Sequence, residues 1–131
     1  MTSIVYLDSS ALLKLVAKEP ESTALRRYWQ SLGQRMSSAL ARAEVLRAAH
    51  AIGPEPLLMA RDVLRRVNLL TIDEELLERA AFLEPLTLRT LDAIHLASAL
   101  AVGSELEEVV TYDKRMAEAA RGLGLRVVAP R

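Results

Sequence analysis

The stretch IVYLDSSALLKL, residues 4–15, decides how the chain begins to fold. Its apolar run stops at Asp8 and restarts at once with the spacing of a helix. A continuous apolar run followed directly by a helical pattern is typical of a buried strand that leads into a helix. An aspartate just before such a pattern is typical of an N-cap, because its carboxylate accepts hydrogen bonds from the free N–H groups of a helix start. This stretch alone leaves open whether Asp8 is a cap or a functional carboxylate.

The same alternation of strand and helix patterns continues along the chain. Short β-branched runs predict strands at residues 3–7, 67–72, 109–112 and 125–128, with a weaker strand at 35–38. Helical spacing covers residues 10–18, 21–32, 39–52, 55–66, 74–82, 91–102 and 114–123. Strands separated by helices form parallel sheets that are covered on both faces. The sequence therefore predicts an α/β fold with a central parallel sheet of four to five strands and about seven helices.

Length and composition narrow the class of protein. The 131 residues, 51% of them hydrophobic, suffice for one core, so we expect a single domain over residues 1–131. Basic and acidic residues number 17 each, so nucleic-acid binding would need a local basic patch. The absence of cysteine excludes disulfides and thiolate zinc sites, and two histidines argue against a histidine-rich metal site. The N-terminal apolar run resembles neither a signal peptide nor a membrane span, so we expect a cytoplasmic protein with no membrane partner.

Four acidic residues are candidates for a functional site. Parallel strands all end at one edge of the sheet, where ligands bind. Asp8 and Asp113 each follow a predicted strand, so both should project from that edge. Asp92 lies in the first turn of a helix that should start there too, and Glu44 lies in the helix after the weak second strand. The predicted topology therefore gathers three of these acids, and Glu44 joins them if its helix packs beside the first strand.

Each acid also has a purely structural explanation. Asp8 and Asp113 could be helix caps, Glu44 could pair with Arg47, and Asp92 could be balanced by Arg89 or by the helix dipole. Four carboxylates at one edge would nevertheless repel each other and raise each other's pKa unless cations held them ionised. Mg²⁺ and Mn²⁺ prefer oxygen ligands and act on phosphodiesters. The pattern thus suggests metal-dependent phosphoryl chemistry and leaves nuclease, phosphatase and phosphoacceptor open.

The stretches that carry these acids resemble the four motifs of the PIN-domain ribonucleases, in particular the VapC-like toxins of toxin-antitoxin systems. The resemblance rests on VYLDSSALLKLVAKEPES, SSALARAEVLRAA, LDAIHLASAL and VVTYDKRMAEAA, in that order along the chain. It implies one PIN domain over residues 1–131 with a three-layer α/β/α fold. It also implies a metal-dependent endoribonuclease, using Mg²⁺ or Mn²⁺, that cleaves structured RNA.

The resemblance assigns the catalytic and metal-binding roles to four residues, which are Asp8, Glu44, Asp92 and Asp113. Ser9 and Thr111 match hydroxyl positions beside the metal site. His95 matches a histidine of the same helix, and we interpret it as a structural hydrogen-bonder rather than as a catalytic group. Where some relatives carry a further acid after the fourth, this chain has Lys114 and Arg115, which puts tight binding of a second metal in doubt.

Relatives of this kind form homodimers and are neutralised by a cognate antitoxin, so we expect both partners here. The segments LRRYWQSL and EPLLMARDVLRRV combine large apolar residues with arginines that suit a partner or RNA phosphates. The arginines concerned are Arg27, Arg61, Arg65 and Arg66. Trp29 and Met59 in the same segments are more simply explained as core residues.

Two other functions compete with the nuclease. A receiver-like, magnesium-binding phosphoacceptor domain would use Asp73 after the third predicted strand, but it would also need an acidic pair after the first strand and a lysine after the last. The chain has neither. A non-catalytic PIN-type interaction module is the second alternative, and the retention of all four acids argues against it.

Overall fold

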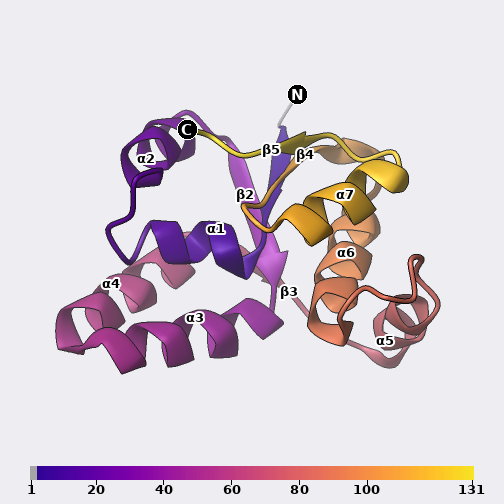
Figure 1. Ribbon diagram of the computed structural model, residues 1–131, viewed down its shortest axis with the longest axis horizontal. Coiled ribbons are helices and arrows are strands. Elements are labelled where there is room, and N and C mark those ends of the chain that lie inside the picture. The colour runs from indigo at the N-terminus through magenta and orange to yellow at the C-terminus, as the bar shows by residue number, and fades with distance from the viewer. Residues whose placement is uncertain (1–2) are drawn as a thin grey trace.

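A computed structural model describes residues 3–131 and shows a sheet of parallel strands between two layers of helices (Figure 1). The strands are β1 (Ile4–Leu7), β2 (Gln34–Ser38), β3 (Asn68–Leu70), β4 (Leu106–Val110) and β5 (Val127–Val128). Their order across the sheet is β3-β2-β1-β4-β5, so the first strand of the chain is the middle one. All four pairings are parallel. The predicted α/β class and parallel sheet are confirmed.

Seven α-helices and one short 3₁₀ helix, Gly103–Glu105, connect the strands within residues 3–131. The α-helices are α1 (Ser9–Lys14), α2 (Ser22–Gln30), α3 (Leu40–Ile52), α4 (Pro54–Arg65), α5 (Glu74–Ala81), α6 (Thr90–Val102) and α7 (Lys114–Gly122). In Figure 1, α1 to α4 lie on one side of the sheet and α5 to α7 on the other. This is the predicted α/β/α layering. None of these helices is long and apolar enough to cross a membrane.

The side chains of β1 alternate between the two helical layers. Val5 and Leu7 belong to the large apolar cluster with α1 to α4, whereas Tyr6 packs with Ala99 and Val109 on the opposite face. This follows from the two-residue period of a strand. Because β1 is the middle strand and its side chains are buried, Tyr6 is held deep between the sheet and α6.

Two boundaries differ from the predicted ones by three residues or more. β4 begins at Leu106, three residues before the predicted start, because the charged pair that precedes Val109 lies in the strand. The buried carboxylate of Glu108 is compensated by a hydrogen bond from the Tyr28 hydroxyl and an ion pair with Arg126 at 3.4 Å. α1 ends at Lys14 rather than at residue 18, since the next two N–H groups bond to carbonyls three residues back and tighten the last turn.

Candidate active site

The structure brings the starts of four helices together beside the carboxyl edge of the sheet (Figure 1). Asp8 directly follows β1, and its backbone N–H donates to the Val110 carbonyl at the end of β4, 3.2 Å away. Asp113 precedes α7, Asp92 lies in the first turn of α6, and Glu44 lies in α3. The side chains of the four acids therefore come from both helical layers and from two adjacent strands. Asp8, Asp92 and Asp113 stand at or near helix starts, as their places in the sequence predicted, and a shared metal site for the four acids stays a prediction.

Asp8 is buried, and its side-chain contacts come from the first turn of α1 and from Thr111, which follows β4. Its Oδ1 accepts from the Ala11 N–H (3.0 Å) and the Ser10 hydroxyl (2.6 Å), and its Oδ2 accepts from the Thr111 hydroxyl (2.5 Å). The cap of α1 is thus confirmed. Burial nevertheless raises the pKa of Asp8 above its usual value, against the lowering effect of these hydrogen bonds.

Glu44 has a different electrostatic environment. Its Oε1 accepts from the Ser9 hydroxyl (2.5 Å) and from Nε2 of His95 (2.7 Å). Burial disfavours the charged form, but the hydrogen bonds from His95 and Ser9 outweigh it, so the pKa of Glu44 is lowered. Within residues 3–131 Glu44 makes no ion pair with Arg47, so that alternative is wrong.

His95 connects Glu44 to the interior of the sheet. Its ring is 2% exposed, and its Nδ1 lies 2.7 Å from the hydroxyl of Tyr6, whose side chain is fully buried. The hydrogen bonds expected of His95 are confirmed, and the absence of a catalytic role stays a prediction. Its contact with Tyr6 was not predicted, because the two residues are 89 positions apart and Tyr6 stands inside an ordinary apolar run.

Asp92 is the acid with the least compensation. In residues 3–131 no hydrogen bond or ion pair reaches its carboxylate, and Arg89 does not pair with it. Burial raises the pKa of Asp92, and the negative charge of Asp113 raises it further, with smaller contributions from two other acids of the site. The positive influence of His95 acts in the opposite direction. The three other acids therefore lie near enough to Asp92 to disfavour its charged form.

Asp113 is the N-cap of α7. Its Oδ1 accepts from the N–H groups of Arg115 (2.9 Å) and Met116 (3.2 Å). The cap uses one of its two carboxylate oxygens, so Oδ2 is free of hydrogen bonds within the described chain. Capping and a role at the sheet edge are therefore compatible for this residue.

The donor set suits a hydrated hard cation. Four carboxylate oxygens of the candidate acids accept no hydrogen bond within residues 3–131. They are both oxygens of Asp92, Oε2 of Glu44 and Oδ2 of Asp113. No three acidic or histidine side chains of that range converge closely enough to enclose an ion. Mg²⁺ keeps several water ligands and binds through one or two carboxylates, so such a site requires no closed cage. The residues fit Mg²⁺ or Mn²⁺ by their chemistry and their mutual repulsion.

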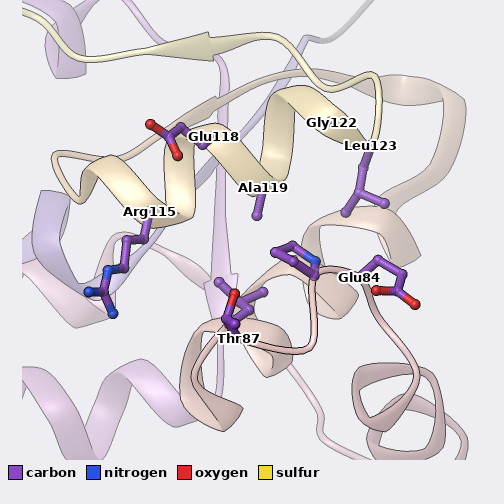
Figure 2. A pocket seen from close by; sticks show the side chains of 9 residues that line it. Glu84, Thr87, Arg115, Glu118, Ala119, Gly122 and Leu123 are labelled. Atoms are coloured by element: carbon purple, nitrogen blue, oxygen red, sulfur yellow. The ribbon is translucent and has the colours of Figure 1, made fainter.

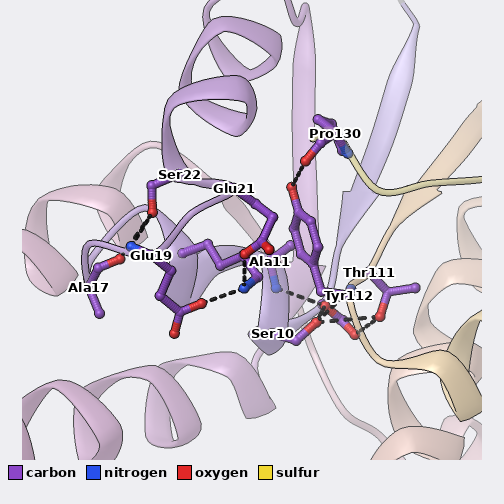
Figure 3. Close-up of polar contacts among 11 residues, drawn as sticks. Ser10, Ala11, Ala17, Glu19, Glu21, Ser22, Thr111, Tyr112 and Pro130 are labelled. Atoms are coloured by element: carbon purple, nitrogen blue, oxygen red, sulfur yellow. Dashed lines mark hydrogen bonds and ion pairs between the residues drawn. The ribbon is translucent and has the colours of Figure 1, made fainter.

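Hydrogen bonds near the acids also fix the end of the chain (Figure 3). The Ser10 hydroxyl accepts from the Tyr112 N–H at 3.0 Å, and the Tyr112 hydroxyl donates to the Pro130 carbonyl at 2.7 Å. The ammonium of Lys14 lies 4.8 Å from the centroid of the Tyr112 ring and pairs with Glu21 at 2.7 Å. We did not predict this cluster, which ties α1 to the C-terminal segment beside the site.

A sizeable cavity lies apart from the acids. About 800 Å³ lies between α7 and the loop that precedes α6, lined by Glu84, Thr87, Arg115, Glu118 and Leu123 among others (Figure 2). None of the four candidate acids lines it. A smaller cavity of about 260 Å³ reaches the candidate site, since Thr111 and Asp113 are among the residues that line it.

The other residues singled out in the sequence lie apart from the acids. Asp73, required by the phosphoacceptor alternative, caps α5 by accepting from the Leu76 N–H at 2.8 Å. The four candidate RNA-binding arginines are exposed on α2 and at α4, which Figure 1 shows away from α6 and α7. One of them, Arg66, pairs with Asp62 at 3.4 Å.

The two apolar residues of the same segments behave differently. Trp29 packs against the main core, as predicted, and the Arg35 guanidinium lies 4.0 Å from its ring centroid. Met59 is 44% exposed, so its assignment to the core is wrong. It stands on the outer face of α4, where helical spacing continues but no element covers it.

Comparisons with known proteins agree on one family. A family profile described as the PIN domain matches residues 5–122. Ribonuclease VapC46 of Mycobacterium tuberculosis (strain ATCC 25618 / H37Rv) is 51% identical over 126 residues, which cover 96% of this chain and 97% of the relative. Ribonuclease VapC35 of M. tuberculosis (strain CDC 1551 / Oshkosh) is 43% identical over 131 residues, 97% of each chain.

Solved structures share the fold. The crystal structure of M. tuberculosis VapC20, described as a sarcin-ricin loop cleaving toxin, superposes with a TM-score of 0.77 at 17% identity. That match covers 96% of this chain and 99% of the other. A toxin-antitoxin complex from Klebsiella pneumoniae matches with a TM-score of 0.73 at 23% identity, covering 97% and 98%. At these identities the likeness concerns the fold.

Proposed function

Because the chain belongs to the PIN-domain family, among the VapC ribonucleases, we propose that it is a metal-dependent endoribonuclease that cleaves structured RNA. Its relatives of 51% and 43% identity are named ribonucleases, which supports the class of reaction. The dependence on Mg²⁺ or Mn²⁺ rests on Asp92. A partly buried carboxylate without a partner, whose pKa is raised by neighbouring acids, is an environment that a cation would relieve.

The proposed roles follow from the contacts of each residue. Asp8, Glu44, Asp92 and Asp113 form the acidic site and would hold the metal, directly or through its waters. Ser9 and Thr111 orient two of these acids, since they donate to Glu44 and Asp8 respectively. A bound divalent ion would supply an activated water and neutralise charge on the phosphodiester. The acids themselves keep the edge negative, so that the ion rather than a basic side chain meets the phosphate.

The proposal includes its partners. We propose that the chain is a single PIN domain over residues 1–131, that it acts as the toxin of a toxin-antitoxin system, and that it forms a homodimer. A similar fold occurs in the K. pneumoniae complex named above and in VapBC-1 of nontypeable Haemophilus influenzae. The outer face of α4, with Leu58 and Met59 exposed among arginines, suits a cognate antitoxin segment that combines apolar and acidic side chains.

The decisive experiment is an RNA-cleavage assay with protein freed of antitoxin. Structured RNA should be cut when Mg²⁺ or Mn²⁺ is present, EDTA should stop the reaction, and fresh metal should restore it. Asp92→Asn, purified in parallel, should lose at least about 100-fold in rate, since it lacks a charge that the cation requires. This variant also controls for contaminating nucleases.

Two results would contradict the proposal. Intact RNA across a range of Mn²⁺ concentrations would favour the non-catalytic interaction module. Undiminished cleavage in EDTA would show that the protein is a ribonuclease that needs no divalent metal. Mapping the 5′ ends of the products identifies the RNA that is cut.

A further inference from the structure

A buried hydrogen-bonded chain runs from the middle of the sheet to the acidic site. We propose that Tyr6 and His95 hold Glu44 by one carboxylate oxygen and so present the other oxygen to the metal or substrate. His95 is then a positioning residue of the nuclease, and Tyr6 is its anchor. This inference rests on the proposed function, and we call the pair the Tyr6–His95 relay.

Each ring nitrogen of His95 lies within hydrogen-bonding distance of a side chain. Nδ1 of His95 lies 2.7 Å from the Tyr6 hydroxyl, and Nε2 lies 2.7 Å from Oε1 of Glu44. The Tyr6 and His95 rings are edge to face, with centroids 5.9 Å apart and planes at 76°. Tyr6 belongs to the middle strand and is fully buried, so its hydroxyl cannot shift without disturbing the sheet. The relay is therefore a rigid support.

The hydrogen-bonding capacity of each atom defines one tautomer. An ionised carboxylate only accepts, so Nε2 must carry the proton that it shares with Glu44. A neutral imidazole has one N–H, so Nδ1 is an acceptor and the Tyr6 hydroxyl donates to it. Tyr6 thus selects the tautomer that can hold Glu44. Removing the hydroxyl of Tyr6 would leave the other tautomer accessible, in which Nε2 and the carboxylate would both be acceptors.

Glu44 is held at one oxygen from two directions. Ser9 and His95 both contact Oε1, at 2.5 and 2.7 Å, while Oε2 has no hydrogen bond within residues 3–131. A long side chain with a pinned oxygen loses its rotational freedom before the substrate arrives. The free oxygen is thereby placed at the edge that the other acids line. Supporting residues of this kind typically change metal affinity or activity by 10- to 100-fold.

A pair of substitutions separates positioning from packing. The side-chain amide nitrogen of glutamine can occupy the place of Nε2 and donate as it does, whereas the side-chain amide oxygen of asparagine can occupy the place of Nδ1 and accept from Tyr6. His95→Gln therefore keeps a donor for Glu44, and His95→Asn keeps only the contact with Tyr6. We expect His95→Asn to lower kcat by about 10- to 100-fold with KM for RNA unchanged, and His95→Gln to recover most of that loss. His50→Asn, on the exposed side of α3, is the matched control.

A second readout needs no catalysis. The chain has two histidines, one exposed and one buried, so ¹⁵N-histidine labelling gives two resolvable ring systems. In wild type we expect His95 in the Nε2–H tautomer, and in Tyr6→Phe a shift toward a tautomeric mixture. The Mn²⁺-induced rise in Tm should also be smaller in His95→Asn than in His95→Gln.

The outcomes distinguish the relay from the nuclease. If the wild-type protein cleaves no RNA, the proposed function is wrong. The tautomer of His95 and the metal-induced shifts in Tm would still test the relay. An Nδ1–H tautomer in wild type would overturn the relay. Equal kinetics of His95→Asn and His95→Gln, at matched Tm, would show that His95 only packs.

Discussion

The carboxylate of Asp8 caps a helix and also belongs to the candidate acidic site. It caps α1 through the Ala11 N–H, and it accepts hydroxyl hydrogen bonds from Ser10 and Thr111 at the sheet edge. Burial raises its pKa all the same, so the contacts do not fully replace water. The cap is confirmed, and metal binding by Asp8 stays a prediction. A residue that begins a helix at the end of a strand is thereby also placed where ligands bind.

Asp92 makes the metal-free protein sensitive to pH. Its folded-state pKa is raised above the ordinary 3.8, first by burial and then by Asp113, so the folded protein binds this proton more tightly than the unfolded chain. Its contribution to stability is greatest below 3.8 and is lost as pH rises through the folded pKa. Asp92→Asn should therefore melt a few degrees higher than wild type at neutral pH without metal, and the difference should shrink in acid.

Thermal melts in chelator-treated buffers test this expectation. Asp73→Asn is the matched control, because it changes an exposed cap residue outside the acidic site and asparagine caps equally well. A lower Tm for Asp92→Asn at neutral pH would mean that the carboxylate stabilises the metal-free fold, and it would remove the main support for a cation there.

Three helices begin with an aspartate cap immediately after a strand region. Asp8, Asp73 and Asp113 accept from backbone N–H groups at the starts of α1, α5 and α7. Each cap satisfies donors that the helix leaves unpaired. In a parallel α/β sheet this places the caps at one edge. Helix capping and the proposed metal chemistry consequently coincide at Asp8 and Asp113, whereas Asp73 is a cap alone.

Substitutions of Asp113 separate these two uses. Asparagine can accept from the Arg115 and Met116 N–H groups, so Asp113→Asn should unfold in urea almost like wild type. Asp113→Ala loses the cap and should be destabilised by about 0.5–2 kcal/mol. Both variants should cleave RNA more slowly, since both lack the charge. Full activity of Asp113→Asn would exclude the carboxylate from catalysis, and equal stability of the two variants would exclude the cap.

The sequence located the elements better than the contacts between them. Hydrophobic periodicity found every strand and helix to within a few residues, because one local pattern encodes each element. It missed the first half of β4, where Glu108 is compensated by Tyr28, 80 positions away. The sequence likewise predicted that Asp92 and Glu44 lie near the edge of the sheet. It did not predict the Tyr6–His95 relay that supports Glu44. Partners brought together only by the fold leave no periodic signal in the chain.

At the scale of the whole molecule, much apolar surface is exposed. The chain exposes 7773 Å² in total, compared with roughly 6,800 Å² expected for a monomer of 14.4 kDa. Four large apolar side chains on α5 and the segment up to the start of α6 are 46–78% exposed, namely Leu77, Phe82, Leu86 and Leu91. Exposed apolar patches of this kind mark interfaces. We propose this surface for the homodimer.

Phe82→Glu tests that surface. A charge at the interface costs desolvation and should shift the protein from a mass near twice 14.4 kDa to a monomer, measured by light scattering. Leu58→Glu on α4, which is 69% exposed, should leave the dimer intact. A monomeric wild type, or dimers of unchanged affinity in Phe82→Glu, would contradict the assignment.

The strand order also determines when the toxin can become active during translation. β1 is synthesised first, yet it needs β4 on one side, where Leu7 lies opposite Val110. Asp113 is made later still, so the four acids can come together only after synthesis has passed β4. A nascent chain that has not reached Asp113 lacks one of the four acids, so we expect it to cleave no RNA. Products of premature stop codons before β4 would keep β1, β2 and β3 but would lack β4, β5 and Asp113, and with them one side of the acidic site.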